Sequence, residues 1–415
     1  MTSTKHFSWI RLLIYLFPVL MDMVAAQVLF VNTVRVAKMG VSASTVAGVT
    51  AVWSLVYMCV CPVLGRFVTA ANSARIMTVS CVSLAILSIL FCVMPGLAGI
   101  YVLAALGGAA AALFFPTFQV FMKAVDTAGG RSAVYSAGIY TFAWSMGYAV
   151  GPLVSGFLME LGSPSGARME TGGWRYTYVI AAAASLLTAA GIYLLKHLAA
   201  RTASIGSDRA PERDAEDGAI DYSRMPDLAW LGWLGSGIGV VALCTVRSVF
   251  PAGAVSVLHF SEGTQGTVFF LLSLAQALTG LVLSVGRRWM YRWWSVSGFG
   301  AIGICGMLCF AFGRTPAQVG VGAVCFGVYA GAFFVYLVFH SLTHPSRSAQ
   351  YVAINEFVVG GAGIAGPLIG GAVADAWGFS RAYLLAAVSI MAVSLFQGVV
   401  HWHQSSGRTA ATRPS

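Results

Sequence analysis

Residues 147–156 read GYAVGPLVSG and residues 362–371 read AGIAGPLIGG, so one Gly-Pro-Leu core occurs twice at an offset of 215 residues. A second match lies upstream of each copy. Residues 131–135 read RSAVY, and residues 347–351 read RSAQY, at an offset of 216 residues. Because the matches follow the same order at nearly one offset, they indicate an internal repeat, and the chain is predicted to consist of two related halves.

The composition excludes an ordinary water-soluble enzyme. Of the 415 residues, 58% are hydrophobic and only 9% are charged, whereas soluble domains carry about 25% charged residues. The apolar residues come in runs of about twenty, the length that crosses about 30 Å of hydrocarbon. Such runs must be helical, because lipid offers no partners for their backbone groups. The sequence predicts twelve spans, at 10–32, 45–64, 76–95, 98–122, 133–159, 176–195, 228–257, 265–285, 294–313, 318–342, 350–374 and 382–400.

One long polar stretch, residues 197–226, separates six predicted spans from the other six. Its mixture of acidic and basic residues is typical of a solvated linker, and a regulatory segment is the alternative. We expect a six-helix bundle at 1–196, a cytoplasmic linker at 197–226, a second six-helix bundle at 227–402 and a cytoplasmic tail at 403–415. The first span is expected to be retained, since it is the first member of the repeated set.

The basic residues indicate the orientation of the chain. The formal net charge is +10, but the Lys and Arg residues lie in short connections and form no basic stripe, so nucleic acid is not an expected partner. With both termini on the cytoplasmic side, seventeen of these residues fall on that side and six on the other. Lys and Arg are enriched in cytoplasmic loops. We therefore predict a multi-pass protein of the cell (inner or plasma) membrane with both termini in the cytoplasm.

The arrangement of six plus six spans, a central cytoplasmic loop and a repeat between halves resembles the major facilitator superfamily of secondary transporters. Members of that family that export substrates against protons carry, in the fifth span, a glycine, three residues, Gly-Pro, two residues and Gly-Gly. The corresponding residues here are Gly147, Gly151, Pro152, Ser155 and Gly156, which depart from that pattern at Ser155. The resemblance implies an all-α fold of two pseudo-symmetric six-helix bundles around a central cavity.

Gly147, Gly151 and Ser155 recur every four residues, which predicts one helix face small enough for close helix contact. A special role in exchange is the alternative. The eleventh span repeats the same face, which favours a symmetric packing device, and a proline in each copy is tolerated because neighbouring helices compensate for the lost donor. The residues assigned to this motif are Gly147, Gly151, Pro152, Gly156, Gly366, Pro367 and Gly370.

Two other family motifs are incomplete. The loop after the second span keeps the family's glycine and a basic residue, Gly65 and Arg66, but Thr69 occupies the position of its aspartate. A charge latch at that aspartate is therefore not implied. Residues 103–109 contain no arginine, so the resemblance does not imply proton antiport through the fourth span.

Ionisable residues inside spans are the candidates for transport chemistry, because a charge at a helix centre costs at least about 2.5–3.5 kcal/mol in lipid. Asp22, near the middle of the first span, could bind a cation or exchange a proton, or it could be a neutral acid bonded to a neighbouring helix. Arg247, in the outer half of the seventh span, could bind an anion or reach the interface. A direct pair between the two is not expected, since their depths differ by about 10 Å. Glu356, near the cytoplasmic end of the eleventh span, could be a protonatable gate or contact Arg347.

Polar residues within spans could supply hydrogen bonds to a solute in the cavity. The ones chosen are Gln27, Asn32, Gln119, Gln276 and Tyr336. Paired aromatics at 114–115 and 333–334 could sandwich an organic substrate, although bulky packing is the alternative.

The sequence thus predicts a secondary active transporter that moves a small molecule by alternating access around a site containing Asp22, with protons or another coupling ion as the energy source. A facilitative uniporter of the same fold and a transporter-like sensor or scaffold are the alternatives. No nucleotide-binding or Ser/His/Asp motif lies in an aqueous segment, so we expect no enzyme. We also expect a monomer in the lipid bilayer without metal or cofactor.

Overall fold

The computed structural model describes residues 13–94, 96–127, 133–161, 172–206, 227–285, 289, 292–342 and 348–411. Twelve helices in this part of the chain are long and apolar enough to cross a membrane. The helices are α2 (Leu16–Lys38), α3 (Ala43–Leu64), α4 (Ala70–Val93), α5 (Leu97–Thr127), α6 (Ala133–Leu161), α7 (Gly173–Gly206), α8 (Ala229–Gly253), α9 (Glu262–Val285), α10 (Trp293–Phe312), α11 (Pro316–Leu342), α12 (Ser348–Trp377) and α13 (Phe379–Ala411), and a π-helical turn η3 (Ala254–Leu258) extends α8.

The structure confirms the twelve-span, all-α prediction, and many of the helix ends differ from the predicted ones by several residues. Helix α2 continues to Lys38, beyond the predicted end at residue 32, because Arg35 is buried inside the bundle. The Arg35 guanidinium lies 3.9 Å from the centre of the Trp174 ring and donates to the Tyr178 hydroxyl at 3.2 Å. Helices α7 and α13 continue to Gly206 and Ala411, past the predicted bundle limits at 196 and 402.

Local sequence explains where several helices begin. Ser42 caps α3, its side chain accepting from the backbone N–H of Thr45. Thr69 caps α4 in a reciprocal capping box with Asn72. At the position where the family's loop motif has an aspartate, this chain therefore uses a threonine to begin a helix. Gly65 ends α3 with a φ of −55°, a value open to any residue, so nothing in the backbone requires glycine there.

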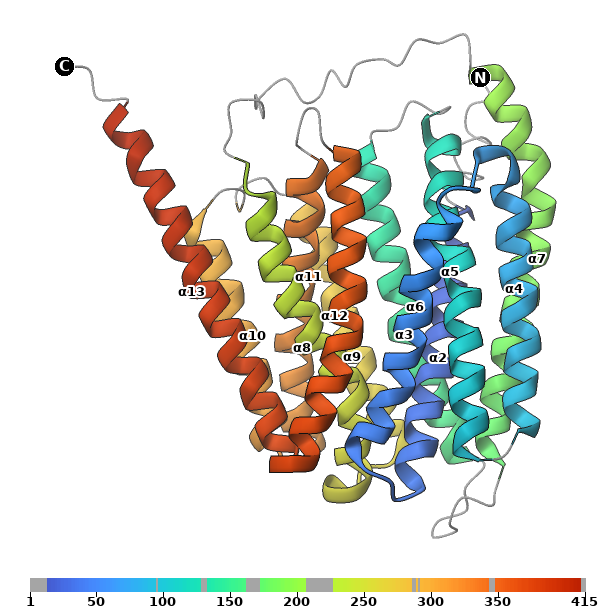
Figure 1. Cartoon of the computed structure of the whole chain (residues 1–415), viewed down its shortest axis with the longest axis horizontal. Coiled ribbons are helices and arrows are strands. Elements are labelled where there is room, and N and C mark those ends of the chain that lie inside the picture. Colours follow the sequence, from blue (N-terminus) through green and yellow to red (C-terminus); the bar gives the residue numbers. More distant parts are fainter. Residues whose placement is uncertain are drawn as a thin grey trace.

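The helices form two bundles that lie side by side, α2 to α7 (blue to green in Figure 1) and α8 to α13 (yellow to red). The glycine face of α6 packs against α2 of its own bundle, since a Cβ atom on Gly147 would lie 2.2 Å from the carbonyl oxygen of Val19. The equivalent face of α12 packs against α8, where a Cβ atom on Gly366 would lie 2.5 Å from the carbonyl oxygen of Val241. In each repeat the first and fifth helices therefore pack closely, because glycine on the fifth helix leaves room for the backbone of the first.

A later glycine on each of these helices joins the two bundles. A Cβ atom on Gly156 would lie 2.3 Å from the carbonyl oxygen of Glu262 in α9, and one on Gly371 would lie 2.7 Å from the Cα atom of Ser44 in α3. The interface therefore has two equivalent seams, α6 against α9 and α3 against α12. At these two positions no side chain larger than glycine fits.

Candidate functional site

A cavity of about 420 Å³ lies between the two bundles, with walls from α2, α3, α5, α6, α8, α11 and α12. Its volume falls within the range of about 300–1,000 Å³ that small-molecule sites occupy. The three predicted charged residues, Asp22, Arg247 and Glu356, all line it, as does Gln119. The structure therefore brings together, from four different helices, four of the residues selected as candidates from sequence.

Asp22 lies on the first helix of the chain's first repeat, where α2 meets α6. Because Gly147 has no side chain, α6 approaches so closely that an added Cβ atom would lie 2.9 Å from the Cβ atom of Asp22. The Asp22 side chain is 7% exposed, and its Oδ2 atom has no hydrogen-bond partner. A buried carboxylate oxygen without a partner is costly, so this atom is available to a proton or to a bound cation.

Arg247 is directed toward the protein interior rather than toward the membrane interface. Its Nη2 atom donates to the Ser273 hydroxyl of α9 at 3.3 Å, and its guanidinium lies 3.8 Å from the centre of the Tyr148 ring. The hydroxyl and the ring are both uncharged. Within the part of the chain that the structure describes, no carboxylate lies within ion-pair distance of Arg247.

The pseudo-symmetry gives the separation of Asp22 and Arg247 along the membrane normal. Gly151 faces Ala26, and the equivalent Gly366 faces Cys244, so Ala26 and Cys244 occupy equivalent depths. Asp22 lies four residues before Ala26, and Arg247 lies three residues after Cys244. Seven residues of helix rise about 10 Å. The two charges interact electrostatically through the cavity but are not a contact pair, which agrees with the expectation from sequence.

Glu356 lies at another corner of the cavity, on α12. It is exposed to the cavity and makes a polar contact with Gln119 of α5. Gln119 also contacts Tyr140 of α6, and the charge of Glu356 is felt by Tyr57 of α3. Glu356 therefore belongs to a polar cluster that joins the two bundles.

Aromatic rings make up much of the remaining wall. Trp53, Tyr57, Tyr140, Trp144 and Tyr148 all line the cavity, and they were not among the residues selected from sequence. Their only sequence signal is helical spacing. Tyr57 is four positions after Trp53, and Tyr140, Trp144 and Tyr148 on α6 follow one another at the same interval of four positions. Core aromatics show the same spacing.

The two predicted phenylalanine pairs divide between cavity and core. Phe115 and Phe334 line the cavity, and the Phe334 ring meets the Trp144 ring edge-on at 5.3 Å across the bundles. Phe114 is fully buried and stacks on Phe118 inside the first bundle. Phe333 packs over the bare backbone of Gly239, where an added Cβ atom would lie 2.4 Å from its ring.

The structure places four of the predicted polar residues outside the set that lines this cavity. Asn32 accepts from Tyr178 at 2.5 Å inside the first bundle, and Gln276 donates to the Ser145 hydroxyl at 3.0 Å on the α6–α9 seam. Gln27 is fully buried, away from the cavity. It follows Asp22 by five residues, which turns it by about 140° around the helix.

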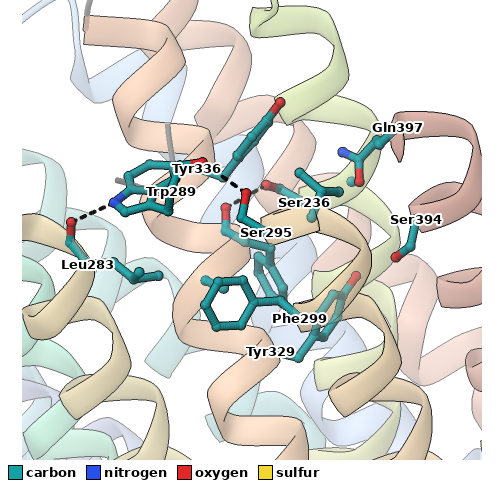
Figure 2. Close-up of a pocket in the computed structure, with 13 residues that line it drawn as sticks. Ser236, Leu283, Trp289, Ser295, Phe299, Tyr329, Tyr336, Ser394 and Gln397 are labelled. Carbon is teal, nitrogen blue, oxygen red and sulfur yellow. Dashed lines mark hydrogen bonds between the residues drawn. The ribbon is translucent and has the colours of Figure 1, made fainter. Parts of the chain in front are cut away.

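Tyr336 is the fourth of these residues and lies inside the second bundle. It lines a separate space of about 40 Å³ together with Trp289 and Ser295, as Figure 2 shows. The Tyr336 hydroxyl hydrogen-bonds the Nε2 atom of His401 at 2.5 Å. Its role is therefore packing within the bundle, since nothing of this residue reaches the central cavity.

Cross-bundle polar contacts close the cavity at the end where α2 stops and α3 starts, which we call the α2–α3 end. Lys38 forms an ion pair with Glu262 there. Asp375 at the end of α12 accepts from the backbone N–H groups of Ala43 at 2.7 Å and Ser44 at 3.0 Å. These two N–H groups are at the start of α3, where unpaired donors favour a carboxylate.

A second carboxylate makes the equivalent contact. Glu160 at the end of α6 accepts from the backbone N–H of Gly263 at 2.8 Å, at the start of α9. Glu160 and Asp375 are 215 residues apart, which is the offset of the Gly-Pro-Leu repeat. We call these two contacts the crossed caps, since each carboxylate caps a helix of the opposite bundle.

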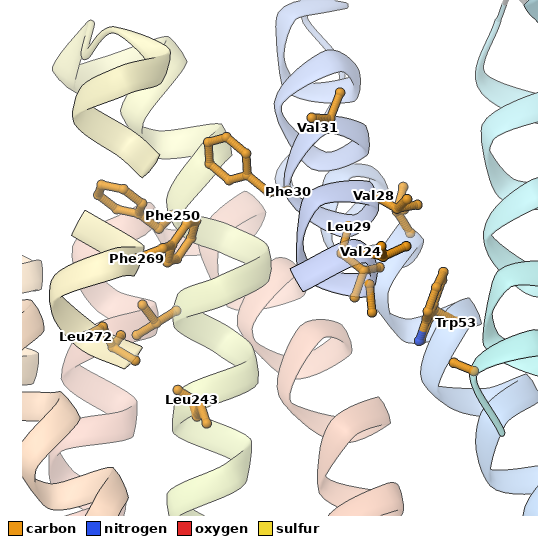
Figure 3. Packing of buried hydrophobic residues seen from close by; sticks show 14 of the residues in the cluster. Val24, Val28, Leu29, Phe30, Val31, Trp53, Leu243, Phe250, Phe269 and Leu272 are labelled. Carbon is orange, nitrogen blue, oxygen red and sulfur yellow. The ribbon is translucent and has the colours of Figure 1, made fainter. Parts of the chain in front are cut away.

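An apolar layer lies beside the crossed caps. Figure 3 shows Phe30 of α2 directed toward Phe250 of α8 and Phe269 of α9. The Phe30 and Phe269 rings meet edge-on with centres 5.7 Å apart, and Phe269 meets Phe250 at the same distance. The α2–α3 end is therefore sealed by polar contacts and by packed rings.

Two pseudo-symmetric bundles of membrane-spanning helices, closed together at one end around a charged and aromatic cavity, define a membrane transporter. The sequence comparisons agree. A family model described as the Major Facilitator Superfamily matches residues 12–339, and the chain belongs to that superfamily. No curated protein matches the chain.

Solved structures share the fold across nearly the whole chain. A bacterial homologue of the human lysosomal transporter Spinster, in an inward-facing and occupied conformation, is 15% identical, with 98% of each chain covered and a TM-score of 0.66. The nucleoside transporter NupG is 11% identical over 95% of this chain and 99% of its own, with a TM-score of 0.66. The human organic anion transporter MFSD10 is 15% identical over 92% and 98%, with a TM-score of 0.57. At these identities the likeness establishes the fold alone.

Proposed function

We propose that this chain is a secondary active transporter that moves a small organic solute by alternating access, with Asp22 linking solute movement to an ion gradient. The observation that carries the proposal is the unpartnered carboxylate oxygen of Asp22 beside a cavity between two rocking units. Ionisable groups at such positions are the usual coupling sites of transporters. The solutes named for the three similar structures differ, so they select none for this chain.

The charge distribution supports an orientation with the α2–α3 end outside the cell. The segment between the bundles and most of the basic residues then lie in the cytoplasm. On this orientation the crossed caps and the Phe30 layer close the outer end, and the structure represents the inward-facing half of the cycle. Opening to the outside requires Asp375 and Glu160 to release the helices that they cap.

The two glycine seams support rigid-body rocking. At one position on each seam a glycine of one bundle touches backbone atoms of the other, as Gly156 does against Glu262 and Gly371 against Ser44. Smooth contacts of this kind let the bundles rotate without repacking large side chains.

The test is flux through the purified full-length chain in reconstituted vesicles, with a metabolite panel and with or without a pH gradient. We expect at least one solute to be moved, and Asp22→Asn to abolish the response of that flux to the gradient while Asp22→Glu keeps it. The matched control is Asp221→Asn, in the polar segment between the bundles.

Three outcomes separate the alternatives. If solute flux through the wild-type chain does not depend on any ion gradient, the protein is a facilitative uniporter. Solutes that stabilise the protein without any of them crossing the membrane would indicate a sensor. Flux that keeps its gradient response in Asp22→Asn would remove Asp22 from the coupling site.

A further inference from the structure

We infer that the solute is a small organic carboxylate with an aromatic or apolar body, that Arg247 binds its carboxylate, and that this binding is coupled to protonation of Asp22. This inference rests on the proposed transport function and names the solute class of the same cavity. The inference follows from two properties of the cavity: the charged side chains that line it, and the fact that Asp22 can be neutralised by a proton whereas Arg247 cannot.

Arg247 carries the charge that no change of protonation removes. A guanidinium stays protonated at any physiological pH, and a permanent charge inside a membrane protein is stabilised by an opposite charge or by backbone carbonyls. The contacts described for Arg247, the Ser273 hydroxyl and the Tyr148 ring, are uncharged. Several of its N–H donors remain for a ligand, and their planar fork matches a carboxylate.

Asp22 is too distant to satisfy Arg247. Its position on α2 is about two turns of helix, or about 10 Å, lower in the cavity than the position of Arg247 on α8, and the two side chains form no ion pair. Coulomb attraction falls with distance, so a solute carboxylate in contact with the guanidinium would be attracted more strongly than Asp22 is. The solute therefore replaces Asp22 as the main counter-charge of Arg247.

The replacement makes protonation of Asp22 favourable. With the solute bound, a charged Asp22 would add a second negative charge against a single cation in a low-dielectric cavity. Taking up one proton restores the charge balance among Arg247, Asp22 and the solute without moving any side chain. The other titratable groups facing Asp22 and Arg247 are Tyr140 and Tyr148 on α6 and Cys244 on α8, and Tyr57 on α3 and Glu356 on α12 lie farther along the cavity.

The aromatic walls select the rest of the solute. Tyr148 lies directly beneath the Arg247 guanidinium, and Trp53, Trp144 and Phe334 continue the same cavity. Rings at these positions stack on an aromatic or flat apolar body. A solute bound in this way would have its carboxylate near Arg247 and its body against these rings.

The test is binding to the purified full-length chain of matched probes that differ only in charge: benzoate, benzyl alcohol and benzylamine, and indole-3-acetate, tryptophol and tryptamine. Calorimetry in two buffers of different ionisation enthalpy gives both the affinity and the number of protons taken up. We expect the carboxylates to bind most tightly in both series, with about one proton taken up per carboxylate bound.

Variants assign the two roles. Arg247→Gln should weaken carboxylate binding by at least about tenfold and leave alcohol binding unchanged, while Arg247→Lys should fall between it and the wild type. Asp22→Asn should still bind carboxylates but take up no proton, and the control Asp221→Asn, in the polar segment between the bundles, should take up the same proton as the wild type. Wild-type selectivity within each series tests the inference even where a variant does not fold.

The inference is overturned if the amines bind more tightly than the carboxylates, if no member of either series binds, if Arg247→Gln binds carboxylates with wild-type affinity, or if proton uptake survives in Asp22→Asn. These outcomes are distinct from failure of transport. A carboxylate that binds with proton uptake but never crosses the membrane refutes the proposed function and leaves the site assignment intact. Transport of amines in preference to carboxylates supports the proposed function and refutes the site assignment.

Discussion

Removing the crossed caps is the perturbation that most directly tests how the bundles are held together. Asp375→Ala deletes the carboxylate that accepts from the first N–H groups of α3, and Glu160→Ala deletes the one that accepts from the start of α9. Both residues lie at helix ends outside the cavity, so neither change alters the proposed solute site. The caps exist only while the α2–α3 end is closed. The free energy lost on removing them should therefore destabilise the closed state alone and shift the equilibrium toward the open state.

The size of the effect follows from the bonds lost. A capping side chain contributes about 0.5–2 kcal/mol, and a charge at a helix N-terminus about 0.3–1 kcal/mol when exposed. Asp375 is exposed and makes two bonds, so we expect Asp375→Ala to cost about 1.4 kcal/mol, a tenfold shift toward the open state. Glu160 makes one bond, for which about 1 kcal/mol, or about fivefold, is expected. The caps are on separate helices and should add, giving about fiftyfold in the double variant.

A native cysteine reports the opening. Cys244 lines the cavity, so on the proposed orientation a membrane-impermeant thiol reagent added outside reaches it when the α2–α3 end opens. The labelling rate of Cys244, corrected by the same measurement on Cys244→Ala, should rise by the factors given above. An unchanged labelling rate in a double variant that remains folded would refute the reasoning, because it would show that the caps do not stabilise the closed state.

Three further outcomes test the packing and the placement of individual residues. Gly366→Ala should lower the free energy of unfolding by about 1–3 kcal/mol, because the new Cβ atom would lie 2.5 Å from the carbonyl oxygen of Val241 and the backbone would have to move. Gly361→Ala is the control, since a Cβ atom there has nothing within 4 Å, and thermal unfolding of the two variants measures the difference. Thr69→Ala should cost about 1 kcal/mol of stability by losing the α4 cap, and an unaltered denaturation midpoint would contradict that role. Tyr336→Phe should lose about 1 kcal/mol with its bond to His401 while KM for transport stays unchanged, and a raised KM would return Tyr336 to the solute site.

The sequence predicted the architecture because the architecture depends on properties that a linear pattern records. Span length, the sign of loop charges and a repeat at one offset are all visible without knowing any contact. It also identified the charged cavity residues, since an unpaired charge in an apolar run has few structural explanations. Asp22, Arg247 and Glu356 all line the central cavity.

The uncharged site residues were harder to predict because a polar side chain in a span can face any direction. Gln27 and Asn32 lie on α2 with Asp22 but at other heights and on other faces of the helix, and the sequence alone does not show which face points to the cavity. Glu160 and Asp375 were also missed, since carboxylates at helix ends are common. Their separation of 215 residues was the available signal, and it gains meaning only when each is seen beside the other bundle.

The crossed caps also bear on how such a molecule could arise. Equivalent carboxylates, each serving the opposite bundle, form the pattern of an isologous dimer, in which one patch on a subunit meets the same patch on its copy. In a pair of identical six-helix subunits, a single acidic residue would supply both contacts at once. After fusion into one polypeptide the two positions are free to diverge, and here one is a glutamate with one bond while the other is an aspartate with two. Unequal contacts at equivalent places give the two sides of the closure at the α2–α3 end different strengths, so that one side can open before the other.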